Sequence, residues 1–230
     1  MDSSDPNIKF DKNNSCDYCL NFEKNIQPSW NNTLQNNQLL SQISNNIRLE
    51  QKNKDFDCII GLSGGLDSSY AAYVAKEKMG LRPLFFHVDA GWNTDQAVGN
   101  IEKLINGLNS DLYTEVVNWD QVKRMQVAFL RSGIPDQDLV QDAVFFSELY
   151  KFAKKNNVKY VLTGSNYSTE CCVEPEEWGG YVGIDKMLFQ NIWDLHGDGK
   201  PNNLPLVDIM VSKIWYQKIL GMKVIYPLNL

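Results

Sequence analysis

The chain has 230 residues, of which 43% are hydrophobic, so it is long enough and apolar enough for one well-packed domain with a smaller appendage. Its formal net charge of -6 and isoelectric point near 5.0 exclude a generally basic surface, which disfavours nucleic acid as a partner. The five cysteines form no disulfide framework, and no segment has the pattern of a secretion signal or a membrane span. We therefore expect a cytoplasmic protein in a reducing compartment, without a membrane partner.

The first part of the chain, residues 1–54, is rich in Asn, Gln and Ser, and we expect an appendage there. Its apolar residues have a weak helical spacing that predicts one short helix. These residues are Leu34, Leu39, Leu40, Ile43 and Ile47. The composition changes at Asp55, so the main domain is expected to cover residues 55–230.

Short apolar runs alternate with amphipathic segments in the main domain. The predicted strands are residues 57–62, 84–89, 112–117 and 158–163. The predicted helices are residues 67–79, 94–108, 120–131 and 138–156. This alternation predicts a doubly wound α/β fold, a parallel sheet with helices on both faces.

The remainder of the main domain, from residue 164, has Trp, Gly and Pro in predicted loops. We expect one helix near residues 212–220 and a short apolar strand at residues 224–226. Because the sequence stops almost directly after this apparent strand, we expect a C-terminal truncation.

A Gly-rich loop at residues 63–69, Ser-Gly-Gly-Leu-Asp-Ser-Ser, follows the first predicted strand and leads into the first helix of the domain. Its glycines permit close backbone approach, and the N–H groups at a helix start favour an anion, so a phosphate site is expected. Its aspartate is expected to bind Mg²⁺, since carboxylate oxygens are preferred ligands of that ion. The predicted nucleotide-binding residues are Ser63, Gly64, Gly65, Asp67, Ser68 and Ser69.

The loop lacks the Gly-Lys-Ser/Thr ending of a Walker loop, which disfavours hydrolysis at the γ-phosphate. The alternative interpretation is a tight strand-to-helix turn, capped by Ser or Asp without a ligand.

The pattern Ser-Gly-Gly-x-Asp-Ser after a strand resembles the PP-loop of the N-type ATP pyrophosphatases. The order of features is similar to that of the N-acetyl sugar amidotransferases of surface-polysaccharide (lipopolysaccharide) biosynthesis. Those proteins have a Phe-Asp…Cys-x-x-Cys segment, the PP-loop, and a Thr-Gly-x-Asn-x-x-Thr-Glu segment, which correspond here to residues 10–19, 63–69 and 163–170. The family's usual cysteine pair before Phe10, or near the far C-terminus, is absent. The resemblance implies the adenine-nucleotide α-hydrolase (HUP) type of fold, with ATP and Mg²⁺ bound at the loop.

The resemblance also implies an activity. An amide or carboxyl oxygen of a nucleotide-linked N-acetylated sugar attacks the α-phosphorus of ATP, and ammonia then displaces AMP to form an amidine. No cysteine with the pattern of a glutaminase nucleophile stands out in a chain with only His87 and His196. Ammonia is therefore expected to come from elsewhere. The resemblance implies a separate ammonia-supplying glutaminase and a cyclase-like subunit as partners.

Cations are needed because attack at phosphorus builds up negative charge. Lys186 and Lys213 lie in the segment expected to fold back over the site, and they join Asp67 as candidate catalytic residues. The alternative is that both are ordinary surface lysines.

The end of the second strand of the domain is expected at the sheet edge where ligands bind. By the resemblance, Val88 and Asp89 are candidates for adenine and ribose contacts, and Trp92 is expected to border the acceptor pocket. The alternative is that His87 is a hydrogen-bonded core residue and Trp92 a packing residue.

The fourth core strand is expected next to the loop if the strand order is 3-2-1-4, and Gly164 then permits backbone approach to the nucleotide. By the resemblance, Asn166, Thr169 and Glu170 face the sugar or a metal. The alternative is a polar turn without a ligand. Farther upstream, Asp138 is interpreted as a helix N-cap.

Cys16 and Cys19 have the spacing of half a zinc knuckle. Structural zinc normally takes four ligands, so two further ligands are needed. Cys171 and Cys172 are poor candidates for the other half since they are adjacent, so cysteines beyond this sequence are expected to complete it. Two other functions remain open. One is a sulfur-transferring or tRNA-modifying PP-loop enzyme that uses Cys171 or Cys172 as its thiolate, and the other is a non-catalytic ATP-binding subunit.

Overall fold

The computed structural model describes residues 3–28, 30, 34–170, 185–200, 202–208 and 210–230. These residues are built around a five-stranded sheet of order β3-β2-β1-β4-β5, in which every pair of neighbours is parallel. The strands are β1 (Cys58–Gly61), β2 (Pro83–Asp89), β3 (Leu112–Val116), β4 (Tyr160–Leu162) and β5 (Lys223–Ile225). The predicted parallel sheet and the predicted order of its first four strands are confirmed.

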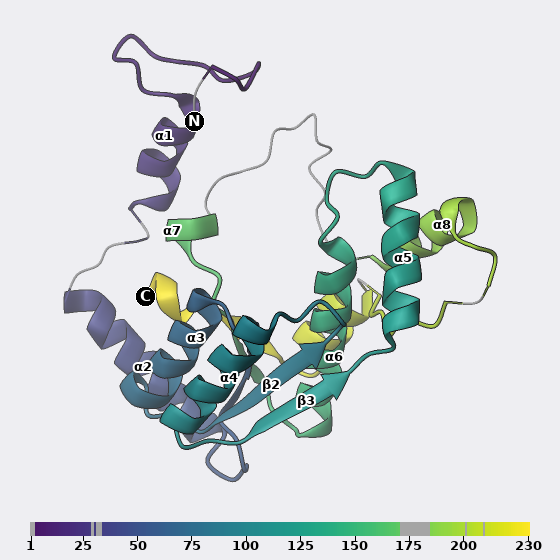
Figure 1. Ribbon diagram of the computed structural model, residues 1–230. Coiled ribbons are helices and arrows are strands. Elements are labelled where there is room, and N and C mark those ends of the chain that lie inside the picture. The colour runs from purple at the N-terminus through teal and green to yellow at the C-terminus, as the bar shows by residue number, and fades with distance from the viewer. Residues whose placement is uncertain (1–2, 29, 31–33, 171–184, 201, 209) are drawn as a thin grey trace.

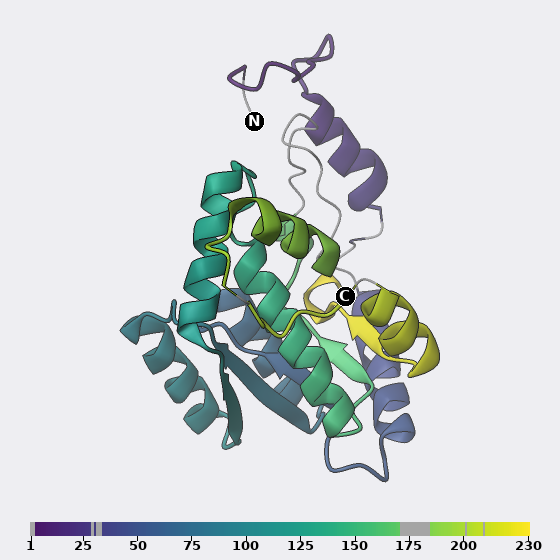
Figure 2. The same ribbon diagram turned by 90° about the vertical axis from the view of Figure 1, so that its right-hand side faces the viewer.

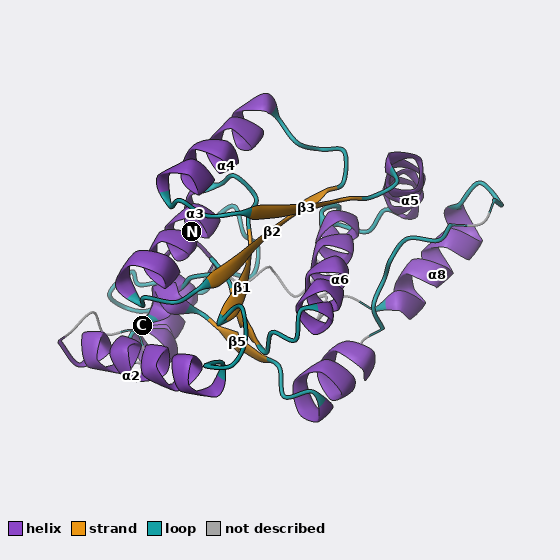
Figure 3. Cartoon of the chain, turned by 90° about the horizontal axis from the view of Figure 1, so that it is seen from below, coloured by secondary structure: helices purple, strands orange, loops and turns teal. Residues whose placement is uncertain are grey.

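Helices cover both faces of the sheet, as Figure 3 shows. One layer comprises α2 (Leu34–Glu50), α3 (Leu66–Tyr73) with its π-helical continuation η2 (Val74–Lys78), and α4 (Asp95–Gly107). The other comprises α5 (Trp119–Ser132), α6 (Leu139–Lys155) and the π-helical segment η4 (Val211–Ile219). Side chains alternate between the two cores, with Ile60 and Phe85 in the first and Ile59 and Phe86 in the second. The doubly wound α/β prediction is therefore correct.

The helix ends follow local rules at most positions. Thr94 caps α4 through its hydroxyl, Asn118 caps α5 through its side-chain oxygen, and Gly133 ends α5 with a φ of 74°. Asp138 lies at the predicted N-cap position of α6, but it does not cap the helix with its side chain. Its backbone is already helical at φ -79°, ψ -13°, whereas a capping residue needs an extended backbone, and its side chain makes no cap bond.

The predicted appendage, residues 1–54, divides into two parts. The short helix predicted there is the 17-residue α2, and Ile47 on it is only 1% exposed in the core beneath α3 and α4. The preceding segment, α1 (Asp17–Asn21) with the π-helical η1 (Phe22–Ile26), projects beyond the carboxyl edge of the sheet (Figures 1 and 2). Trp30 packs between Phe22 and Tyr167, with ring centroids 6.2 Å and 6.3 Å away.

Five helical segments among the described residues were not predicted. They are α1 and η1, together with α7 (Tyr167–Glu170), α8 (Lys186–His196) and the 3₁₀ turn η5 (Pro227–Asn229). Asp185 caps α8, and Phe189 packs on Phe129 of α5 with ring centroids 4.8 Å apart. α8 therefore lies on the outer side of α5, as Figure 1 also shows.

Candidate active site

The 63–69 loop comprises the turn after β1 and the first turn of α3, at the point where the strand order of the sheet reverses. The chain runs from β1 to β2 and β3 on one side, and returns to β4 and β5 on the other. Ligands of open parallel sheets bind at the carboxyl ends of the strands at such a switch point. The tertiary structure thus places the loop where a ligand site is expected.

The two glycines of the loop have different roles. Gly64 has a φ of 79°, and a Cβ atom there would lie 2.5 Å from the backbone oxygen of Ala97. Asn100 of α4 also donates to Gly64 O at 3.1 Å, so the turn is packed directly against α4. Gly65 has an extended backbone with only Ser63 Oγ near a Cβ position, at 3.3 Å, and it leaves that part of the loop open.

No side chain caps the start of α3. The first N–H groups of a helix have no partner within the helix, so those of α3 are available to an external acceptor, with the helix dipole behind them. Together with the open backbone at Gly65, this arrangement fits a phosphate group.

The loop serines hold the turn closed. Ser63 Oγ and Ser68 Oγ lie 3.1 Å apart, and Ser69 Oγ donates to Gly65 O at 2.7 Å. Ser68 Oγ also accepts from the N–H of Ser63 at 3.3 Å. The hydroxyl of Ser69 is thus committed to the turn. The hydroxyls of Ser63 and Ser68 bond to each other at 3.1 Å and to the backbone of Ser63 and Gly65 at 3.3 Å.

His87 supports the loop from the neighbouring strand. Its Nδ1 lies 2.7 Å from Leu62 O and its Nε2 lies 2.9 Å from Asn93 Nδ2. The imidazole therefore donates from Nδ1 to the backbone before the loop and accepts at Nε2. The interpretation of His87 as a hydrogen-bonded core residue is confirmed.

The other residues predicted at the end of β2 lie along the same edge. The side chain of Val88 is buried in the core under α5 and α6, so only its main chain remains for a nucleotide. Asp89 Oδ1 accepts from the N–H of Gly91 at 2.9 Å. Trp92 is 53% exposed and packs edge-on against Trp119, with centroids 5.1 Å apart, so it is both a packing residue and an accessible surface of the rim.

The segment after β4 meets the loop, as the predicted strand order requires. A Cβ atom at Gly164 would lie 2.7 Å from both Asp67 C and Ser68 N, and Thr169 Oγ1 donates to Asp67 Oδ2 at 3.4 Å. The absent side chain at Gly164 thus makes room for the first turn of α3, and the approach of a nucleotide to its backbone stays a prediction.

Asn166 has its side chain fully used within its own turn. Its Oδ1 accepts from the N–H groups of Ser168 at 3.0 Å and Thr169 at 3.2 Å, and its Nδ2 donates to Gly164 O at 3.1 Å. The structure therefore agrees with the alternative of a polar turn at Asn166. Thr169 and Glu170 keep their predicted place on the rim.

Carboxylates from α6 and α7 face one another near this rim. Burial away from water raises the pKa of Asp142 to about 6, and the negative charges of Asp136, Asp138 and Glu170 add to this shift. Asp142 lies three and four residues before Phe145 and Phe146, hence on the same side of α6. The sequence analysis did not select Asp142, because its burial and the approach of Glu170 depend on the tertiary structure.

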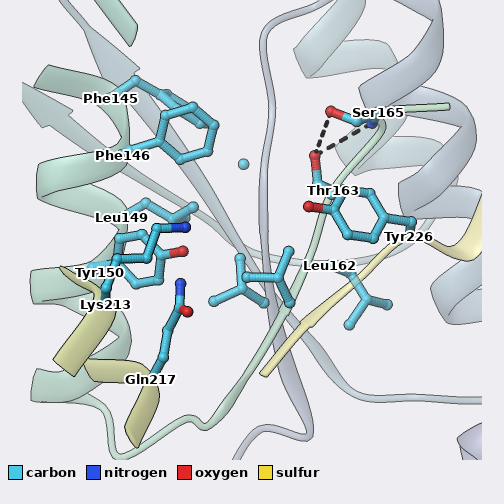
Figure 4. Close-up of a pocket in the computed structure, with 13 residues that line it drawn as sticks. Phe145, Phe146, Leu149, Tyr150, Leu162, Thr163, Ser165, Lys213, Gln217 and Tyr226 are labelled. Atoms are coloured by element: carbon cyan, nitrogen blue, oxygen red, sulfur yellow. Dashed lines mark hydrogen bonds between the residues drawn. The ribbon is translucent and has the colours of Figure 1, made fainter. Parts of the chain in front are cut away.

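A cavity of about 170 Å³ opens beneath the carboxyl ends of β1 and β4, between α6 and η4 (Figure 4). It is lined by Gly61, Phe145, Phe146, Leu149, Tyr150, Val161, Leu162, Thr163, Ser165, Lys213, Gln217, Val224 and Tyr226. Lys213 and Gln217 reach into it from η4. Thr163 Oγ1 accepts from the N–H of Ser165 at 3.3 Å near its mouth.

The two lysines predicted to act in catalysis are separated by the fold. Lys213 lines the cavity next to the loop. Lys186 is exposed at the first position of α8, on the outer side of α5, and no contact recorded for the described residues joins it to the loop. Lys213 is therefore the better placed of the two.

Cys16 and Cys19 lie together at the start of α1, with their sulfur atoms 3.4 Å apart. Two thiolates at this separation fit one edge of a tetrahedral zinc site, whose Zn–S distances are about 2.3 Å. Within the described residues, however, no group of three or more His, Cys, Asp or Glu side chains is arranged to hold a metal. Cys171 and Cys172 lie outside the described residues.

No family model matches the sequence. The uncharacterized protein MJ1599 of Methanocaldococcus jannaschii is 28% identical over 116 residues, which are 50% of this chain and 40% of that protein. This chain thus matches less than half the length of that relative. Among the helices of the described residues, none is long and apolar enough to cross a membrane.

Three solved structures of synthetases show a similar arrangement of elements. The NH3-dependent NAD synthetase of Campylobacter jejuni has a TM-score of 0.43 and 20% identity. The match covers 81% of this chain and 74% of the synthetase chain. The NMN synthetase of Francisella tularensis has a TM-score of 0.44 and 25% identity, with coverages of 82% and 71%. The glutamine-dependent NAD+ synthetase of Acinetobacter baumannii, solved with ADP, has a TM-score of 0.46 and 16% identity, with coverages of 78% and 35%.

Proposed function

We propose that this chain is an ATP pyrophosphatase of the PP-loop class, which cleaves ATP to AMP and pyrophosphate while activating an acceptor oxygen. The observation that carries the proposal is the 63–69 loop. It lies at the switch point of the sheet, its shape depends on a left-handed Gly64, and it presents the uncapped start of α3. A turn that served only to join β1 to α3 would need neither the opening at Gly65 nor an uncapped helix start.

We further propose that the enzyme is an amidotransferase. The acceptor oxygen, an amide or carboxyl oxygen of a nucleotide-linked N-acetylated sugar, bonds to the α-phosphorus, and the bond from that phosphorus to pyrophosphate breaks. Ammonia then bonds to the activated carbon, and AMP leaves. The resemblance of residues 10–19, 63–69 and 163–170 to the sugar amidotransferases supports this finer assignment.

Different residues around the loop would contact the phosphates, the magnesium ion and the acceptor. The N–H groups of α3 and the hydroxyls of Ser63 and Ser68 would bind the phosphates. Asp67, held by Thr169, would bind Mg²⁺, which offsets charge on the leaving pyrophosphate. Lys213 would supply a further cation, and the rim from Asp89 to Trp92 would border the nucleotide and the acceptor.

The ammonia is proposed to come from a separate glutaminase through a cyclase-like subunit. Among the described residues, Cys58 is buried, and burial raises the pKa of its thiol well above its usual range, so it is not a nucleophile. The paired Cys16 and Cys19 are proposed as a zinc half-site rather than as catalytic groups.

The test is exchange of labelled pyrophosphate into ATP in the presence of a panel of nucleotide-linked N-acetyl sugars. We expect exchange that depends on one sugar and is abolished by Asp67→Asn. The exposed Asp95→Asn is the matched control, because that residue begins α4 outside the loop, and exchange should survive it. ATP binding without exchange under any sugar would refute the amidotransferase and leave a nucleotide-binding subunit.

A further inference from the structure

The segment around Cys16 and Cys19 is held in shape by its own hydrogen bonds. Phe10 pairs with Cys16 in a short antiparallel bridge, and Lys9 O accepts from the N–H of Asp17 at 2.9 Å. The two sulfur atoms lie 3.4 Å apart, and the N–H of Cys19 donates to Cys16 Sγ at the same distance. The segment thus sets the sulfur pair in place before any metal ion binds.

The aspartates near the sulfur pair make hydrogen bonds within the segment. Asp5 Oδ2 accepts from the hydroxyl of Tyr18 at 2.7 Å. Asp11 Oδ1 accepts from two backbone N–H groups at 2.8 Å and 2.9 Å, and Asp17 Oδ1 accepts from two at 3.2 Å and 3.3 Å. These carboxylates therefore stabilise the fold of the segment instead of adding ligands to the cysteines.

Other metal-binding side chains of the described residues lie elsewhere in the fold. His87 is hydrogen-bonded on β2, His196 lies at the end of α8, and Cys58 is buried in β1. Over the same residues, no group of three or more His, Cys, Asp or Glu side chains could hold a metal ion. Zinc normally takes four ligands, so a zinc ion on Cys16 and Cys19 needs two ligands from another source.

Apolar side chains flank the sulfur pair at the surface. Phe10, beside Cys16, is 49% exposed, and Leu20, directly after Cys19, is 40% exposed. Cys19 itself is also exposed. Apolar side chains exposed singly are normal, but here two of them lie beside an incomplete metal site. This surface therefore offers both metal ligands and apolar area to a partner molecule.

The segment is packed at its base and exposed at its tip. At the base, Trp30 packs between Phe22 of η1 and Tyr167 of α7, with ring centroids 6.2 Å and 6.3 Å away. Beyond that contact, the part of the segment that carries the cysteines stands clear of both helical layers of the described residues (Figures 1 and 2). Another molecule can therefore approach the cysteines without displacing a core helix.

We propose that the missing half of the zinc site comes from a second copy of this chain. Two copies related by a two-fold axis through the metal bring together the same two cysteines from each, which gives the four thiolates of a tetrahedral zinc site. The proposal rests on the zinc half-site of the proposed function and names the partner that completes it. Metal binding releases the thiol protons to water, and no oxidant or reductant takes part. Phe10 and Leu20 of both copies are covered in the same contact.

The test measures the mass and the metal content of the full chain with zinc and a phosphine reductant. We expect twice the chain mass of 26.3 kDa, with one zinc ion for every two chains, and a return to monomers when a chelator removes the zinc. Co²⁺ in place of Zn²⁺ should show the charge-transfer absorption of four thiolate ligands. Both measurements use the wild-type chain, so they do not depend on the folding of a variant.

Substitutions then identify the ligands and the contact. Cys19→Ser, with folding checked by circular dichroism, should abolish the zinc-dependent doubling of mass. Cys171→Ser combined with Cys172→Ser is the matched control and should keep both the zinc and the dimer. Leu20→Ser should weaken the dimer about tenfold, whereas Leu39→Ser, 42% exposed on α2, should leave it unchanged.

A monomer that binds one zinc ion per chain would overturn the proposal, because all the ligands would then come from the same chain. Loss of zinc from the Cys171 and Cys172 variant, or a dimer that persists without zinc, would overturn it as well. Absence of zinc binding would refute the half-site together with the dimer. Pyrophosphate exchange is measured separately, and its absence in a zinc-bound dimer would count against the proposed enzyme activity alone.

Discussion

The substitution Gly64→Ala is the sharpest test of the loop geometry. An alanine at φ 79° costs about 1–2 kcal/mol, because its Cβ crowds the following carbonyl oxygen. The same Cβ would lie 2.5 Å from Ala97 O and 2.8 Å from Ala97 Cα, which are helix backbone atoms that cannot rotate away. Overpacking of this kind costs about a further 1–3 kcal/mol.

Replacing glycine by alanine also restricts the unfolded chain, which returns about 0.4–1 kcal/mol. We therefore expect Gly64→Ala to lower the free energy of unfolding by about 1–5 kcal/mol. Gly65→Ala is the matched control. Its backbone is extended and its nearest Cβ neighbour is Ser63 Oγ at 3.3 Å, so its effect should stay within about 1 kcal/mol.

The measurement is urea unfolding followed by tryptophan fluorescence, with ATP affinity determined on the same proteins. If the loop relaxes locally in Gly64→Ala, part of the cost will appear as weaker ATP binding, about tenfold for each 1.4 kcal/mol. Equal unfolding free energies and equal ATP affinities for wild type and Gly64→Ala would refute the described packing of the loop on α4.

Three further predictions concern stability. Ile47→Ala should cost about 2–5 kcal/mol in urea unfolding because α2 shares the domain core, whereas Leu49→Ala, at a 70% exposed position, should cost less than about 0.5 kcal/mol. Hydrogen bonds from Arg124 lower the pKa of Asp198 to about 2. The contribution of this pair to the stability of the fold is therefore present above the ordinary pKa of aspartate and is lost as the pH falls towards about 2. Asp198→Asn should lack this acid-dependent loss when both proteins are unfolded across that range. The pKa of Asp142 is raised to about 6, so the fold loses stability as the pH rises from about 4 to about 6. Asp142→Asn should therefore exceed the wild type in stability above about pH 6 but not below about pH 4.

Local patterning was sufficient to predict most of the α/β body. The buried strands β1, β2 and β4 are short apolar runs, and the amphipathic helices between them have clear periods, so both signals are contained in neighbouring residues. α8 was missed although Asp185 caps it and Phe189 and Ile192 recur at helical spacing. The surrounding Trp, Gly and Pro content outweighed that short pattern. α2 was underestimated because only a few of its residues meet the core.

The candidate site likewise has a part that neighbouring residues predict and a part that they do not. The order of Gly64, Gly65 and Asp67 between a strand and a helix indicates a phosphate loop without reference to any distant residue, since the backbone freedom and the helix start are local properties. The partners of that loop are long-range contacts. Asn100 on Gly64 O, His87 on Leu62 O and Gly164 against Asp67 each join segments that periodicity cannot pair.

The amino-acid sequence by itself determined the fold class and the position of the 63–69 loop, because both depend on the period and backbone freedom of adjacent residues. Only the tertiary structure decided which lysine lies near the loop, placing Lys213 in the cavity and Lys186 on the outer side of α5. It also decided that Asn166 is a turn residue and that Asp142 lies among other carboxylates. The places of the two lysines, and of Glu170 near Asp142, depend on how helices pack across the sheet, which brings together segments far apart in the chain.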